Sequence, residues 1–130
     1  MNEAKPDSTS SSSMLVFIVD DEPMLLDLAA TILQPLGYEV RTFRDPKVAL
    51  AEFPAAKPTV LVTDYAMGGM NGMDLIRECK RLNPAQKIML LSGTVDESIY
   101  NNEAAKPDLF LAKPYQIKAF VDAVRQLTGR

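Results

Sequence analysis

The chain alternates short apolar segments with segments whose apolar residues recur at helical spacing. The apolar segments are rich in branched side chains, which is typical of strands buried on both faces of a sheet; they lie at residues 15–19, 38–43, 59–64, 87–93 and 108–112. Helices are predicted in the intervening sequence, at about residues 23–36, 46–55, 72–82, 95–104 and 117–127. Five such βα units predict an α/β fold with a parallel sheet between two layers of helices, for which one common strand order is 2-1-3-4-5.

Proline, glycine and asparagine mark the ends of these helices. Gly37 is expected to end the first helix, and Pro35 is expected to bend or shorten its last turn. Asp45 followed by Pro46 is a typical helix start. The helix at residues 95–104 is predicted to be the weakest, because its two adjacent asparagines are poor helix formers.

Length and composition favour one domain at residues 14–130, after a disordered, serine-rich tail at residues 1–13. The net charge of −3 gives no basic surface for nucleic acid or an anionic membrane. The sequence has no secretory signal and no apolar run near the ~18–20 residues that span a bilayer. A single cysteine, Cys79, excludes an internal disulfide, so a cytoplasmic location is expected.

Polar side chains follow four of the five predicted strands at their carboxyl ends. They are Asp20, Asp21 and Glu22 after the first strand, Asp64 after the third, Ser92 after the fourth and Lys113 after the fifth. Any one of them alone is explained equally well as a turn former, a helix cap or a solvated side chain. The carboxyl ends of parallel strands meet at one edge, however, so the set is predicted to converge on one site.

Converging carboxylates repel one another, and a divalent cation removes that cost. The chain has no histidine, which leaves an oxygen-only ligand set that favours Mg²⁺ or Mn²⁺ over zinc. Mg²⁺ commonly bridges protein carboxylates to phosphate oxygens, and a serine hydroxyl with a lysine ammonium completes an electrostatic clamp for a phosphoryl group. The sequence therefore predicts a magnesium-dependent phosphoryl site.

The motifs DD, DYAMGGMNG, LLSG and FLAKP, in this order, resemble the receiver domain of two-component response regulators, including the chemotaxis regulators. The resemblance implies a flavodoxin-like three-layer domain that takes a phosphoryl group from the phosphohistidine of a sensor kinase or phosphotransfer protein. It implies that Asp64 is the acceptor and that Mg²⁺ is held by Asp20, Asp21, Asp64 and the carbonyl of Ala66. By the same resemblance, Ser92 and Lys113 contact the phosphoryl oxygens, and Ser92 and Phe110 form the switch.

The sequence departs from the family pattern at several positions near the site. Gly68 stands where proline is usual, Gly93 where alanine is common, and Phe110 where tyrosine is frequent. These departures bear on the conformational response rather than on phosphoryl acceptance. The small side chain of Ala66 cannot orient an attacking water, so slow loss of the phosphoryl group is expected.

Two other functions compete with the phosphoacceptor switch, which is not itself expected to be an enzyme in the ordinary sense. A Mg²⁺-dependent phosphatase with an aspartate nucleophile usually has a second acid two residues later, where this chain has Ala66. A degenerate flavodoxin-like binding module would not need the full set of site residues. Output is expected through a downstream protein, with residues 95–104, the fifth strand and the last helix as the partner or homodimer face, and the sequence leaves open whether the receiver stands alone.

Overall fold

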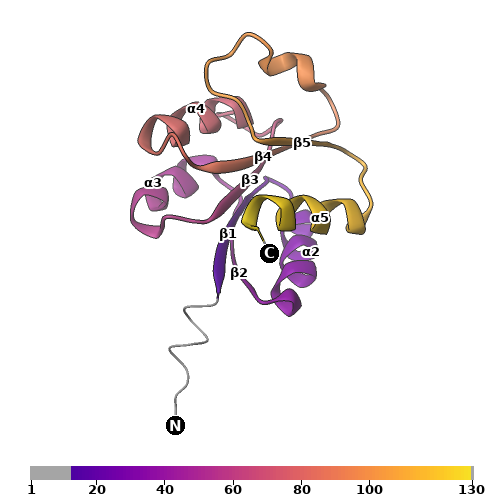
Figure 1. Cartoon of the computed structure of the whole chain (residues 1–130). Helices are drawn as coiled ribbons and strands as arrows, with labels where there is room; N and C mark the ends of the chain where they lie inside the picture. The colour runs from indigo at the N-terminus through magenta and orange to yellow at the C-terminus, as the bar shows by residue number, and fades with distance from the viewer. Residues whose placement is uncertain (1–12, 130) are drawn as a thin grey trace.

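The computed structural model describes residues 13–129 of the chain, so the predicted tail, apart from Ser13, lies outside the described residues. Five parallel strands form one sheet: β1 (Met14–Val19), β2 (Tyr38–Phe43), β3 (Val60–Asp64), β4 (Lys87–Ser92) and β5 (Leu109–Ala112). Their order across the sheet is β2-β1-β3-β4-β5, which confirms the predicted α/β fold and its strand order (Figure 1).

Helices cover both faces of the sheet. Helices α2 (Pro23–Leu33) and α5 (Ile117–Thr128) lie together on one side, and α3 (Pro46–Ala56) and α4 (Gly72–Leu82) lie on the other (Figure 1). Because side chains alternate along each strand, the central strands supply two separate apolar cores. In β1, for example, Val16 and Ile18 belong to the core under α2 and α5, whereas Phe17 and Val19 belong to the core under α3 and α4.

The helix ends follow the local sequence signals. The short 3-10 helix η1 (Gln34–Leu36) contains Pro35 and follows α2 directly, which confirms that the proline shortens the α-helix. Gly37 then adopts a left-handed conformation with φ of 97°, which glycine accepts without steric cost. At the start of α3, the Asp45 carboxylate accepts a hydrogen bond from the backbone N–H of Lys47, as an N-cap does.

The predicted helix at residues 95–104 is wrong. The chain forms only one short 3-10 helix there, η2 (Glu97–Tyr100), and continues in turns to β5. None of the η2 residues is buried, so packing does not offset the poor helix propensity of Asn101 and Asn102. The partner face that was expected to include a fourth regular helix therefore consists of this irregular segment beside β5 and α5.

Within residues 13–129, no helix combines the length and the apolar character that crossing a membrane requires.

Candidate functional site

The sheet fixes the backbone of the site residues, because its hydrogen bonds continue past the strand ends. The N–H of Asp20 donates to the carbonyl of Phe43 at 3.0 Å, next to the last paired residues of β1 and β2. The N–H of Lys113 donates to the carbonyl of Ser92 at 2.8 Å, beyond the end of β5. Side chains at the ends of four neighbouring strands are therefore anchored to a rigid ladder.

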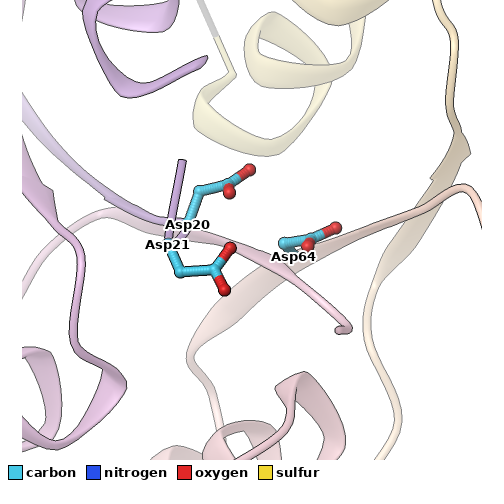
Figure 2. A group of neighbouring side chains, drawn as sticks. All are labelled: Asp20, Asp21 and Asp64. Atoms are coloured by element: carbon cyan, nitrogen blue, oxygen red, sulfur yellow. The ribbon is translucent and has the colours of Figure 1, made fainter. Parts of the chain in front are cut away.

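Three carboxylates gather at this edge of the sheet (Figure 2). Asp20 and Asp64 are buried, with 3% and 7% of their surface exposed, while Asp21 is exposed. One carboxylate oxygen from each residue lies within 4.8 Å of the other two. One exposed and two buried carboxylates in such a cluster form an oxygen-only set that suits a hard cation with several bound waters.

Lys113 bridges two of the acids. Its Nζ lies 3.2 Å from Oδ2 of Asp20 and 3.1 Å from Oδ1 of Asp64. Burial by itself lowers the pKa of the Lys113 ammonium, but the hydrogen bond to Asp64 and the charges of Asp20 and Asp64 outweigh it, and the pKa is raised. The peptide bond that follows, between Lys113 and Pro114, is cis.

Asp64 is the last residue of β3, and it is buried. Burial raises the pKa of its carboxyl above the ordinary value, the charge of Asp20 adds to this effect, and the Lys113 ammonium opposes it. The carbonyl of Asp64 is closely approached by α4, because a Cβ built on Gly72 would lie only 2.5 Å from that oxygen. The first residue of α4 therefore has to be glycine for the helix to begin this close to the end of β3.

Ser92 is buried at the end of β4, but its hydroxyl is engaged by the following loop. Its Oγ accepts hydrogen bonds from the backbone N–H groups of Thr94 and Val95, both at 3.0 Å. It also shares a hydrogen bond of 3.3 Å with the hydroxyl of Thr94. The structure thus places Ser92 at the predicted edge, with the hydroxyl bonded to residues 94 and 95.

A hollow of about 450 Å³ opens above the acids. The predicted residues Asp21, Asp64, Ala66 and Lys113 line it, and Ala66 is exposed to solvent. Glu22, which was predicted to converge on this edge, and Gly93, which was noted near the site, also line the hollow, and sequence reasoning missed Thr94. Thr94 carried a usable signal, since it is a hydroxyl residue two positions after a predicted site serine.

Phe110 lies in the edge strand β5 and is half-buried against the core under α3 and α4. Its ring centroid is 6.4 Å from that of Tyr100, at an interplanar angle of 47°. Phe110 is thus within contact distance of η2, which belongs to the connection between Ser92 and β5. Within residues 13–129, the Phe110 ring is found against Tyr100 and the core under α3 and α4, not against the acids.

Residues 16–125 match the response regulator receiver domain family. The chain belongs to this family, and its receiver domain has an acidic pocket formed by Asp20, Asp21 and Asp64. The match covers every strand end that carries a predicted site residue. The family was therefore inferred correctly from the sequence motifs.

Curated relatives differ in how much of their length the chain covers. It is 30% identical over 117 residues to the probable transcriptional regulatory protein TcrX of Mycobacterium tuberculosis, covering 88% of this chain and 50% of that protein. It is 29% identical to the chemotaxis protein CheY of Thermotoga maritima, covering 87% of this chain and 96% of that protein. The chain thus spans half the length of the first relative and nearly all of the second.

Solved receiver structures share the fold. A response regulator receiver domain from Clostridium thermocellum superposes with a TM-score of 0.82 at 26% identity, covering 90% of this chain and 95% of that one. The response regulator TrrA of Thermotoga maritima, solved in complex with Mg²⁺ and BeF, gives a TM-score of 0.77 at 26% identity, covering 88% of this chain and 98% of that one.

Proposed function

We propose that Asp64 is the phosphoacceptor and that it receives the phosphoryl group from the phosphohistidine of a sensor kinase or phosphotransfer protein in the cytoplasm. An Asp64 carboxylate oxygen attacks phosphorus, and the bond between phosphorus and the donor's imidazole nitrogen breaks. The leaving imidazole takes up a proton. The observation that carries this proposal is the buried Asp64 carboxylate at the end of β3, 3.1 Å from the Lys113 ammonium and clustered with two further acids.

Asp20, Asp21 and Asp64 fit a Mg²⁺ or Mn²⁺ site, and the backbone carbonyl of Ala66 is proposed as a further ligand. When bound, the cation offsets the negative charge shared by these carboxylates and the phosphoryl oxygens. TrrA, the relative solved with Mg²⁺ and BeF, supports this assignment. The ammonium group of Lys113 lies 3.1–3.2 Å from carboxylate oxygens of Asp20 and Asp64, so it is positioned to pair with a phosphoryl oxygen.

The proposed switch begins at Ser92. In this structure its hydroxyl oxygen accepts hydrogen bonds from the backbone N–H groups of Thr94 and Val95. Turning the hydroxyl toward a phosphoryl oxygen on Asp64 breaks those hydrogen bonds. The connection to β5 is then released to move together with Phe110, which contacts it through Tyr100. The proposed output is a changed protein-binding or homodimer surface on this connection, β5 and α5, where Ile99 and Ile117 are exposed by 37% and 56%.

The decisive test is the intact mass of the chain after incubation with acetyl phosphate, with and without Mg²⁺. We expect one added phosphoryl group that requires the metal and disappears in Asp64→Asn. The matched control is Asp122→Asn, which removes an exposed carboxylate on α5 that pairs with Lys118. A native chain that stays unmodified while folded rejects the phosphoacceptor assignment and favours a degenerate binding module.

The chain is also proposed to assist the loss of its own phosphoryl group, but slowly. Ala66 lines the hollow above Asp64 and has no polar atom on its side chain to position a water. We expect Ala66→Asn to shorten the lifetime of the phosphorylated chain in a mass-spectrometric decay assay. Equal lifetimes would assign no such role to this position and would leave the acceptor role of Asp64 intact.

A further inference from the structure

A second hollow lies far from the acids, at the amino ends of β4 and β5. It has a volume of about 570 Å³ and lies between the last turns of α4 and residues 104–108, the chain that leads into β5. We call it the α4–β5 groove. Four of its nine lining residues are cationic, although the chain as a whole carries a net charge of −3. They are Arg77, Lys80, Arg81 and Lys106.

The cations keep unused hydrogen-bond donors despite their intramolecular partners. Arg77 pairs with Asp74 and with Glu103, and Arg81 pairs with Glu78, each through part of a guanidinium group that offers five N–H donors. The acids in these three pairs do not line the groove, whereas Asp108 does line it and pairs with Lys80. Lys106 is exposed, and no ion pair is found for it among residues 13–129. The groove therefore presents cationic donors to an incoming anion without first breaking the existing pairs.

Lys80 is held in place on the groove. Its Nζ is 3.1 Å from Oδ2 of Asp108, and the same oxygen accepts the backbone N–H of Ile88 at 2.8 Å. Only 18% of the Lys80 side chain is exposed. Because Asp108 is tied to β4 in this way, the ammonium sits at a fixed point beside the groove and little side-chain entropy is lost when it binds an anion.

The remaining lining favours an extended peptide over a nucleotide. Pro84, Ala104, Ala105 and Pro107 give an apolar floor with no aromatic ring for a base. Arg77 and Arg81 are one helical turn apart, about 6 Å along the axis, which is close to the ~6.6 Å between alternate residues of an extended strand.

We propose that the α4–β5 groove binds an extended acidic segment of a partner protein, with acidic side chains at alternate positions. Alternate carboxylates contact Arg77 and Arg81 on α4, and Lys106 contacts the segment from the opposite wall. The small residues between the acids lie on the proline and alanine floor. This surface is separate from the phosphoryl site, so the proposal stands whether or not Asp64 is the acceptor.

The test is a fluorescence-anisotropy titration of the full chain with a labelled peptide of about ten residues that has Glu at alternate positions and Ala or Ser between them. We expect saturable binding that weakens as salt is added. Lys106→Glu is expected to weaken binding about three- to tenfold, since it reverses one exposed contact. Lys47→Glu makes the same charge change at an exposed position on α3 and is expected to leave the dissociation constant within about twofold.

Amide chemical shifts of the native chain locate the peptide, and changes confined to residues 77–84 and 104–108 support the groove. The proposal is overturned by no saturable binding, by equal weakening in Lys106→Glu and Lys47→Glu, or by shift changes elsewhere. Displacement of the peptide by a stoichiometric amount of ATP, or binding of the chain to anionic phosphatidylserine vesicles with the same Lys106→Glu dependence, would assign the groove to a phosphate compound or a lipid surface instead.

Discussion

The two connections on either side of β4 differ in how much of their chain is buried. The connection before β4 contains α4, which has a full capping box at Asn71 and Asp74 and buries five residues, among them Leu75 and Cys79. The connection after β4, residues 93–108, contains only η2, which buries none. Both connections start from site residues, Asp64 and Ser92 respectively.

This difference separates a rigid part of the site from a part that can move at low cost. Segments with few buried apolar contacts open locally with much less free energy than the whole domain needs to unfold. Residues 93–108 are such a segment, and they hold the Ser92 hydroxyl and contact Phe110. The carboxylates of the proposed metal and acceptor site, in contrast, lie at the ends of β1 and β3, where the neighbouring helices are regular.

Thiol labelling gives the largest expected contrast between the two connections. Burial, with a smaller effect of the Glu78 charge, raises the pKa of the Cys79 thiol to about 12, so almost no thiolate forms in the folded chain at pH 8. We expect Ile99→Cys in η2 to react with a disulfide reagent at least about a thousandfold faster than Cys79 in the same molecule. Similar rates for the two thiols would show that α4 opens as readily as η2.

Truncation of an apolar side chain should lower the free energy of unfolding more in α4 than in η2. Leu75 is fully buried in α4, so Leu75→Ala should lower the free energy of unfolding by about 2–5 kcal/mol. Ile99 is 37% exposed, and Ile99→Ala should cost less than about 1 kcal/mol. Urea denaturation with unchanged m-values measures both, and a larger loss for Ile99→Ala would refute the comparison.

Substitutions at two glycines test how tightly the start of each connection is packed. A Cβ on Gly72 would lie 2.5 Å from the Asp64 carbonyl and 2.9 Å from both Leu90 and Tyr65, so Gly72→Ala should cost about 1–3 kcal/mol. A Cβ on Gly93 would meet its nearest neighbour, Lys113, at an ordinary 3.4 Å. Gly93→Ala should therefore stay within about 0.5 kcal/mol of the native chain in the same denaturation assay. Equal losses would mean that the start of α4 adjusts more freely than this packing indicates.

Removing the helix caps should give the smallest effects. The Asn71 side chain accepts the N–H of Asp74 at 2.8 Å, so Asn71→Ala should destabilise the domain by about 1 kcal/mol and Asn71→Ser by less. Asp96 caps η2 by accepting the N–H of Ser98, and Asp96→Ala should leave global unfolding unchanged while hydrogen exchange in residues 97–101 accelerates. A loss of global stability in Asp96→Ala would show instead that η2 unfolds cooperatively with the rest of the domain.

Most of the fold could be predicted from the sequence, because the helix caps, the prolines and the apolar spacing indicated the same elements. At residues 45–56, cap, proline and apolar spacing all indicate a helix, and α3 forms there. At residues 95–104 the apolar spacing alone indicated a helix, while the asparagines opposed it, and burial was not available to decide. Whether such a segment forms a helix depends on how much of it packs against the rest of the molecule, and this packing cannot be deduced from a single sequence.

The predicted site residues were placed by topology, since residues at strand ends must meet. What could not be predicted was which hydrogen bonds each side chain makes. Lys113 reaches both Asp20 and Asp64, and Ser92 is held by its own loop. The α4–β5 groove was equally hidden, because its cations lie in two stretches that only the fold brings together. Distances between remote side chains depend on the assembled backbone.

The sheet hydrogen bonds that continue past the strand ends have a consequence for how this domain can diversify. The N–H groups of Asp20, Tyr65 and Lys113 are each held by a carbonyl of a neighbouring strand, and none of these bonds involves residues 93–108. Beyond Val95, the connection between β4 and β5 can therefore be exchanged for one of different length or chemistry while the acids keep their positions. The proposed phosphoryl chemistry and the proposed partner surface are, in that sense, separately heritable traits of one small domain, and an engineer can graft a new loop after Val95 without redesigning the acid cluster.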